Sequence, residues 1–252
     1  MRTYWAISLL LAAAAPVAAQ APANVKASVA ATAARDAENV MLDAGRKPAE
    51  VLAFFGLQKG MRVLDLFGAN RYWAEIVAPA VGPKGQVTVW EPTQFSSDKA
   101  KTAFDAFAAR QKNVSLMSSP MQAPAFAPNT YDFAILNLDY HDLYWESAKY
   151  KIPRMNPDAW IATLYAAMKP GGIVALTDHA AAPGGDTRAV VEKYHRIDPA
   201  TARADFERAG FIIEATSNLL ANPADAHDLN VFDEKIRGKT DRFMIKLRKP
   251  AK

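Results

Sequence analysis

The stretch RVLDLFGANRYW at residues 62–73 decides the fold of this chain. Its first half is apolar apart from Arg62 and Asp65, which is typical of a buried strand, and a short turn then leads into a helical pattern from Tyr72. A second apolar stretch, VTVWEP at 87–92, ends in another acid, Glu91. A strand, a turn and a helix, followed by a second strand with an acidic end, indicate an open α/β sheet that holds a nucleotide-like ligand.

Apolar strands and amphipathic helices alternate along the rest of the chain. The strands are expected at 63–67, 87–91, 114–117, 133–138, 173–177, 211–216 and 243–247, and the helices near 72–81, 98–111, 157–168 and 199–209. This alternation predicts an α/β fold: a Rossmann-like, seven-stranded, mostly parallel sheet with helices on both faces. The last two strands lack a clear helix between them, so the last strand is expected to run in reverse, after a long loop at 218–242.

The N-terminal residues have the pattern of a targeting segment. Arg2 precedes an apolar run from Trp5 to Val17, and small residues follow it up to Gln20. We expect residues 1–19 to be a cleaved signal peptide and the mature protein to be periplasmic or secreted, with a retained anchor as the alternative. The absence of cysteine from the chain is compatible with export.

The remaining length of the 252-residue chain is expected to form one domain. Residues 20–34 are rich in alanine and predict a flexible leader or a frayed helix, ahead of a single domain over 35–252. Within it, residues 35–56 predict an N-terminal helical lid of two helices that meet near Arg46 and Lys47, where Pro48 interrupts the pattern.

The charge composition of the chain limits the classes of binding partner that we expect. The net charge of +4 comes from basic and acidic residues mixed along the chain. We therefore expect no nucleic-acid partner, no stable membrane insertion after signal cleavage, and a small-molecule substrate, with the oligomeric state left open. Neither a Gly-x-Ser-x-Gly elbow nor a phosphate-binding Gly-x-x-x-x-Gly-Lys loop is present, which disfavours a hydrolase or a P-loop enzyme.

Two further segments complete a family pattern. YDFAILNLDYHD at 131–142 follows the second acidic strand, and MKPGGIVALTDH at 168–179 joins a helix end to an apolar strand through Lys-Pro-Gly-Gly. In this order the four segments resemble a class I S-adenosylmethionine-dependent methyltransferase, over most of residues 60–250. Residues 141–145 and 231–243 are similar to an exported branch of that superfamily, often named simply "predicted methyltransferase".

The resemblance implies that S-adenosylmethionine is the cofactor and that an unidentified small molecule accepts the methyl group. The cofactor would lie across residues 65–72 with its ribose hydroxyls on the second acidic strand end. The cofactor-binding residues implied are Asp65, Gly68, Asn70, Glu91, Ser119 and Asn137.

The first turn departs from the family pattern, which has three glycines there. Phe67, Ala69 and Arg71 stand at those positions, and Gly68 lies between them. Side chains at glycine positions are expected to crowd the ligand. The alternative is therefore a non-catalytic exported protein, a pseudoenzyme that binds another ligand or a protein partner in the cleft. An open cavity between Gly68 and Glu91 would favour the enzyme, and filling by Phe67 and Arg71 the alternative.

Polar side chains follow the fourth and fifth strands, which are neighbours in such a sheet. They are Asp139, His141, Asp142, Asp178 and His179, and they are expected to converge at one mouth. His141, Asp139 or His179 is the candidate catalytic base. No metal is required, although Asp139, Asp178 and His179 are an alternative ligand set, and mutual hydrogen bonding is the structural alternative.

An aromatic stretch follows the fourth strand. Tyr140, Tyr144 and Trp145, with His195 from a later segment, are expected to wall a pocket for the acceptor. The alternative is that the aromatic rings pack within the lid, with Asp198 explained as the cap of the next helix.

Overall fold

The computed structural model describes residues 20–251 and contains a seven-stranded sheet in the order β3-β2-β1-β4-β5-β7-β6. β1 to β5 run parallel, and β7 runs antiparallel to both of its neighbours, β5 and β6. The strands are β1 (Arg62–Leu66), β2 (Gln86–Pro92), β3 (Val114–Ser119), β4 (Tyr131–Asn137), β5 (Met168–His179), β6 (Ile212–Ser217) and β7 (Arg242–Arg248). The predicted fold class, with a reversed last strand, is confirmed.

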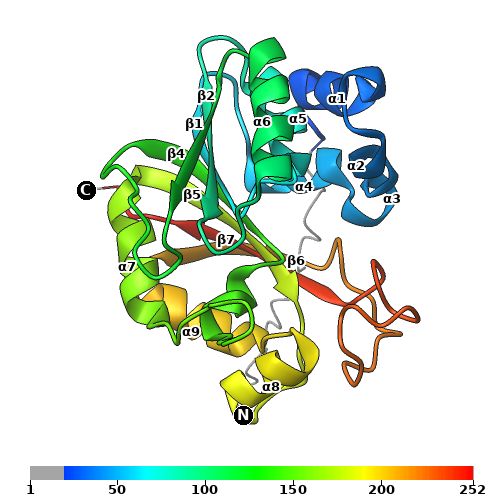
Figure 1. The fold of residues 1–252 in the computed structure, drawn as a ribbon, viewed down its shortest axis with the longest axis vertical. Coiled ribbons are helices and arrows are strands. Elements are labelled where there is room, and N and C mark those ends of the chain that lie inside the picture. Colours follow the sequence, from blue (N-terminus) through cyan, green and yellow to red (C-terminus); the bar gives the residue numbers. More distant parts are fainter. Residues whose placement is uncertain (1–19, 252) are drawn as a thin grey trace, which may run out of the picture.

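Two layers of helices cover the sheet, with α5 and α6 on one side and α7 and α9 on the other (Figure 1). The helices are α1 (Ala23–Ala30), α2 (Ala37–Met41), α3 (Asp43–Arg46), α4 (Pro48–Phe55), α5 (Tyr72–Val81), α6 (Asp98–Arg110), α7 (Pro157–Ala167), α8 (Thr187–Tyr194) and α9 (Pro199–Arg208). Two short 3-10 helices, η1 (Thr32–Ala34) and η2 (Tyr140–Tyr144), complete the elements.

The alternation of side chains along each strand divides the core in two. From β1, Val63 joins the core under α4 and α5, whereas Leu64 joins the core under α7 and α9. The core under α7 and α9 contains Leu64, Trp90 and Phe206, and the side chains of all three are fully buried. Because the parallel strands all end at the same edge, this packing fixes the residues that follow β1, β2, β4 and β5 side by side.

The N-terminal region differs from the flexible leader that the sequence predicts. Residues 23–30 form a regular helix, α1, in which Val25 is fully buried against the core that contains α5. Burial of Val25 outweighs the low content of large apolar residues. The break expected near Arg46 and Lys47 is present, where Lys47 adopts a left-handed conformation, but a further break at Leu42 divides the first part into α2 and α3, so the lid has three helices rather than two.

A long irregular segment at 218–241 joins β6 to β7 and contains no helix or strand, as expected. A buried ion pair ties it to the body of the protein: the Arg196 guanidinium donates to both oxygens of Asp225, at 2.8 and 3.1 Å. His227 pairs with Asp241 within the same segment, at 3.0 Å. These contacts give the segment a defined course beside α8.

The signal peptide expected at residues 1–19 lies outside the described residues. Within residues 20–251, every helix is too short or too polar to cross a membrane.

Candidate functional site

Asp65 is the most unusual group at the carboxyl edge of the sheet. The residue is 1% exposed, and neither carboxylate oxygen has a hydrogen-bond partner among the described residues. The nearest backbone donor, the N–H of Ala74 in the first turn of α5, lowers its pKa but lies outside hydrogen-bond geometry. Burial, together with the charge of Glu91, raises the pKa of Asp65 to about 7. A buried carboxylate without a donor costs free energy, which a ligand at this point would recover.

Gly68 explains how the turn approaches this carboxylate. A Cβ atom at position 68 would lie 2.7 Å from the Asp65 Oδ2 atom and 2.9 Å from the Val89 side chain. Only glycine fits there, so the one glycine of the turn is required by close packing on Asp65. The sequence places this glycine between the positions where the family has its own.

Glu91 ends β2 beside the same turn. It is 9% exposed and accepts one hydrogen bond, from the backbone N–H of Ala69 at 3.2 Å. Burial raises the pKa of Glu91 to about 7, although the Ala69 bond opposes the shift. Asp65 and Glu91 are therefore two neighbouring buried carboxyls, of which only Glu91 accepts a backbone hydrogen bond, from Ala69.

Arg71 does not crowd this site, in contrast to the expectation, whereas Phe67 borders it. Both keep the left-handed backbone that glycine adopts easily, with φ of 55° and 65°. The Phe67 ring packs on Trp90, at 5.0 Å between centroids, within the core under α7. The Arg71 side chain turns to Asp36, at 3.0 Å, and to Glu75, at 3.7 Å. The turn thus uses left-handed backbone at two of the three family glycine positions, and its Arg71 side chain is directed to Asp36 and Glu75.

A cavity of about 90 Å³ lies beside Asp65 and Gly68. Its lining residues are Arg46, Asp65, Leu66, Phe67, Gly68, Asn70, Trp73, Asn137, Leu138 and Asp139. Arg46 comes from α3 of the lid, and its guanidinium lies over the Tyr72 ring at 4.2 Å. Sequence reasoning missed Arg46; its position at the junction of the two predicted lid helices was the available signal.

A larger hollow of about 690 Å³ lies between α1 and the end of α5. It is bordered by Lys59 and Gly60, which precede β1, and therefore belongs to the opposite, amino-terminal edge of the sheet. Ligands of open parallel sheets bind at the carboxyl edge, so the smaller cavity is the candidate cofactor site.

The other residues expected at the cofactor divide into two groups. Asn70 and Asn137 line the cavity. Ser119 is 8% exposed, and its hydroxyl accepts hydrogen bonds from the Trp90 indole N–H, at 2.9 Å, and from the Ala125 N–H, at 3.2 Å. Ser119 is thus occupied by core groups, and its expected role at the cofactor is not supported by its position.

His141 lies at the mouth in a fixed orientation. Its Nδ1 atom is 2.8 Å from Asp178 Oδ1, and its backbone N–H donates to Asp178 Oδ2, also at 2.8 Å. Burial lowers the pKa of His141, but the charges of Asp178 and Asp142 and the Asp178 hydrogen bond outweigh it and raise the pKa to about 9. Asp178 is fully buried and also accepts from the His179 N–H, at 2.7 Å.

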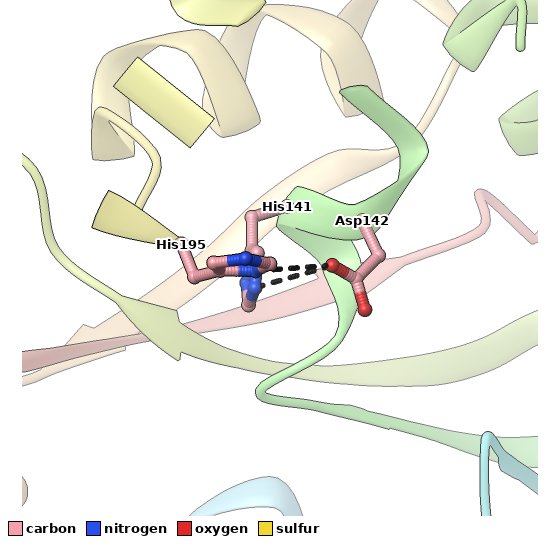
Figure 2. Close-up of side chains that lie close together, drawn as sticks. All are labelled: His141, Asp142 and His195. Carbon is pink, nitrogen blue, oxygen red and sulfur yellow. Dashed lines mark ion pairs between the residues drawn. The ribbon is translucent and has the colours of Figure 1, made fainter. Parts of the chain in front are cut away.

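A second histidine faces the first from a distant segment. His195 follows α8 with a left-handed φ of 51°, and one carboxylate oxygen of Asp142 faces both imidazoles from the same side (Figure 2). Asp142 Oδ1 is 3.4 Å from His141 Nε2 and 3.7 Å from His195 Nδ1. The possible ligand atoms of these three residues all lie within 4.8 Å of one another. The expected alternative ligand set of Asp139, Asp178 and His179 is not the group that the fold brings together.

His179 and Asp139 occupy different surroundings. The His179 Nδ1 atom is 2.7 Å from the Thr240 hydroxyl, and burial, with the charge of His141, lowers its pKa well below the usual value. Asp139 lines the small cavity, and burial together with the charge of Asp142 raises its pKa well above the usual value. Asp139 therefore connects the cofactor cavity to the histidine mouth, whereas His179 is directed toward the β7 side.

Tyr140 does not line an open pocket, whereas Tyr144 is partly exposed and its expected place in an acceptor pocket stays a prediction. Tyr140 is fully buried, and both tyrosine hydroxyls donate to Asp205 Oδ2 on α9. Trp145 remains at the mouth, with its ring 5.1 Å from that of His195. The alternative, in which the aromatic residues pack within the protein, holds for Tyr140.

Comparison with solved structures identifies the fold. A methyltransferase from Aquifex aeolicus that depends on S-adenosylmethionine superposes with a TM-score of 0.58 and 18% identity, over 88% of this chain and 98% of that one. An arsenic(III) S-adenosylmethionine methyltransferase from Chlamydomonas reinhardtii gives 0.57 and 15%, over 91% and 74%. The chain has the class I methyltransferase fold. No protein-family model and no curated protein sequence matches it.

The methyltransferase fold does not by itself fix a reaction. The [4+2]-cyclase SpnF superposes equally well, with a TM-score of 0.58 and 19% identity, over 83% of this chain and 82% of that one. The residues at the cavity and the mouth, rather than the fold, therefore indicate the function.

Proposed function

We propose that this protein is an S-adenosylmethionine-dependent methyltransferase that acts on a small-molecule acceptor. One observation carries the proposal: Asp65 is buried at the carboxyl end of β1 without a hydrogen-bond partner among residues 20–251, beside a turn that only Gly68 allows. Such a carboxylate is destabilising in the free protein, and its presence is explained by a ligand that supplies donors or positive charge.

The chemistry of S-adenosylmethionine fits these groups. Its ribose offers two hydroxyl donors and its methionine part carries an ammonium group, next to the sulfonium that supplies the methyl group. Glu91, at the end of the second strand, would accept from the ribose hydroxyls, and Asp65 would face the positive charge. Asn70 and Asn137 line the same cavity and offer amide groups for the remaining polar atoms.

The cavity requires the lid to open. A volume of about 90 Å³ is below the roughly 300–1,000 Å³ of ordinary ligand pockets. Arg46 on α3 occupies one side of it. Polar contacts hold the lid to the turn and to α5: Arg71 pairs with Asp36, the Asn39 amide donates to the Asn70 carbonyl at 2.9 Å, and the Tyr72 hydroxyl donates to Asp43 at 2.9 Å. Opening of α2 and α3 would have to break these contacts, together with the contact of Arg46 with the Tyr72 ring.

Two residues can accept the proton that a methyl acceptor loses. His141 is oriented by Asp178 and becomes a base once it is deprotonated, above its pKa of about 9. Asp139 lies directly at the cofactor cavity. The rest of the catalytic effect would come from positioning of the two reactants.

A second function is favoured by the small size of the cavity and by the absence of the usual turn glycines. In this alternative the protein binds another ligand in the cleft and transfers no methyl group. The export that the sequence predicts is part of both proposals, with the site of action in the periplasm or outside the cell.

Calorimetric titration of the purified protein with S-adenosylmethionine and S-adenosylhomocysteine tests the proposal. We expect micromolar binding that Glu91→Gln weakens by about 100-fold, since a charge-assisted pair of hydrogen bonds is lost. The control is Glu207→Gln, on the exposed side of α9, which should bind as the wild type does. Absence of binding in the wild-type protein would refute the methyltransferase and leave the second function.

A further inference from the structure

Three side chains at the mouth lie close together, and the proposed methyl transfer gives a role to His141 alone among them. His141 and Asp142 lie on η2, directly after β4, and His195 follows α8, so the chain brings them together from segments more than fifty residues apart. Figure 2 shows both imidazoles directed at one carboxylate oxygen of Asp142. That oxygen is buried and has no hydrogen-bond partner among residues 20–251.

We infer that His141 Nε2, Asp142 Oδ1 and His195 Nδ1 bind one divalent transition-metal ion, such as Zn²⁺ or Co²⁺. Two imidazole nitrogens and one carboxylate are the ligands that such ions prefer, whereas Mg²⁺ and Ca²⁺ prefer oxygen atoms alone. Three protein ligands also leave at least one coordination position open, as in catalytic metal sites.

The spacing of the ligand atoms agrees with this assignment. Metal–ligand bonds of 2.0–2.1 Å in a tetrahedral site place neighbouring ligand atoms about 3.3 Å apart. The two separations that involve Asp142 Oδ1 are 3.4 Å to His141 and 3.7 Å to His195. The ligand atoms of the third pair, His141 and His195, lie within 4.8 Å of each other, and binding of the ion would bring them closer.

The surroundings hold the first ligand in place. Asp178 accepts from His141 Nδ1 at 2.8 Å and from the His141 backbone N–H at 2.8 Å, which assigns the ring proton to Nδ1 and leaves the Nε2 lone pair for the ion. Because the pKa of His141 is raised to about 9, Nε2 also carries a proton at neutral pH, and an ion that binds there displaces it while Nδ1–H stays on Asp178. Carboxylate–histidine–metal arrangements use the same contact to orient the ligand. Asp178 is fully buried, so its position is fixed by the core.

The second histidine is held by its backbone and by aromatic neighbours. His195 ends α8 in a left-handed conformation, with φ of 51° and ψ of 50°. Its ring lies 5.1 Å from that of Trp145 and 5.2 Å from that of Phe232. The side chains of Asp142 and His195 are each 14% exposed, which leaves the ion a path from solvent.

The role of the ion rests on the proposed function, whereas its binding does not. Asp139, two residues from His141, lines the cofactor cavity, so the open coordination position lies next to the place where an acceptor would enter. A hydroxyl of the acceptor bound there would lose its proton to water more readily. The metal would then replace His141 as the means of activation.

The test is titration of the chelator-treated, purified protein with Zn²⁺ by calorimetry and with Co²⁺ by visible absorption, which reports nitrogen ligation. We expect micromolar or tighter binding of one ion per chain and d–d bands for Co²⁺. Asp142→Asn and His195→Asn should each weaken binding by at least 100-fold. Asparagine tolerates the left-handed conformation at position 195, so the fold is retained. His227→Asn, which removes a histidine paired with Asp241 elsewhere, should have no effect.

The inference is overturned if no ion binds more tightly than at millimolar concentration, or if both variants bind as the wild-type protein does. Titration with S-adenosylmethionine in the presence of chelator separates the two proposals. Retained cofactor binding with no metal binding would contradict the metal site alone. Absence of S-adenosylmethionine binding to the protein without chelator, with metal binding retained, would contradict the methyltransferase proposal alone.

Discussion

Asp65 and Asp178 occupy equivalent places near the carboxyl ends of β1 and β5, and both are almost fully buried, yet their surroundings are opposite. Asp178 accepts three hydrogen bonds, from His141 N–H, His141 Nδ1–H and His179 N–H. Asp65 accepts none among the described residues. The first carboxylate is satisfied by the protein and organises the mouth. The second lacks partners, and we attribute its burial to a ligand.

The largest expected effect is that of Asp178→Asn. The amide would present donors to N–H groups that now donate to a carboxylate, and the buried partner of His141 would be lost. Breaking a buried charged pair costs about 3–5 kcal/mol. We expect the free energy of unfolding, measured by urea denaturation, to fall by about that amount. A change below about 1 kcal/mol would show that Asp178 does not organise the mouth.

Asp65→Asn should act in the opposite direction on stability. The folded-state pKa of about 7 lies above the ordinary 3.8, so the favourable contribution of the protonated carboxyl is complete below pH 3.8 and lost by about pH 7. The shift corresponds to at most about 4 kcal/mol. Because the amide is also buried without partners, we expect a gain of about 2 kcal/mol at pH 8. The same variant should bind S-adenosylmethionine about 100-fold more weakly.

Thermal unfolding from pH 4 to pH 8 checks the sign of this effect. The wild-type protein should lose stability relative to Asp65→Asn as the pH rises through about 7. Parallel curves for the two proteins would mean that Asp65 has a partner or an ordinary pKa.

The contrast between the two carboxylates also marks what a sequence can and cannot predict. The acids that end β1 and β2, and the polar cluster after β4 and β5, are predictable because parallel strands end at one edge. The number of donors around each acid is not, since it depends on whether His141 turns toward Asp178. The seven strands were predictable from their apolar runs, whereas α8, short and polar, was not.

Tyr140 and His195 show why the details of the mouth escaped prediction. Tyr140 was expected in a pocket, but its hydroxyl reaches Asp205, sixty-five residues further along the chain. His195 reaches Asp142 only because the backbone becomes left-handed where α8 ends. The positions of both side chains depend on contacts with residues distant in sequence, which local sequence patterns do not predict.

Arg46→Ala removes the positive charge that lies with Asp65 in the lining of the cavity, and so tests whether Asp65 is kept for a cationic ligand. Arg46 lines the cavity beside Asp65 and must move before a cationic ligand enters. We expect cofactor affinity to rise about 5-fold, or about 1 kcal/mol, chiefly through faster association measured by stopped flow. Arg154→Ala, at an exposed position outside the cavity, serves as the control. Weaker binding of Arg46→Ala would instead make Arg46 a ligand of the cofactor.

The smallest effect is expected for Arg71→Gly. Glycine relieves a left-handed backbone conformation worth about 1 kcal/mol, but the ion pair with the half-exposed Asp36 is lost. These changes nearly cancel, so the free energy of unfolding should change by less than about 0.5 kcal/mol. A large loss of stability would show that the ion pair between Arg71 and Asp36 stabilises the protein more than its exposure indicates.

The most direct test of the central claim is the proton release that accompanies cofactor binding. Calorimetric titrations with S-adenosylmethionine at pH 7, in buffers of different ionisation enthalpy, measure the number of protons released. With the pKa of Asp65 and of Glu91 at about 7, both carboxyls are partly protonated at this pH, and a cationic ligand favours their ionised forms. We predict release of about one proton, reduced in Asp65→Asn, and affinity that rises through pH 7. Binding without proton release, or no binding at all, would contradict the account.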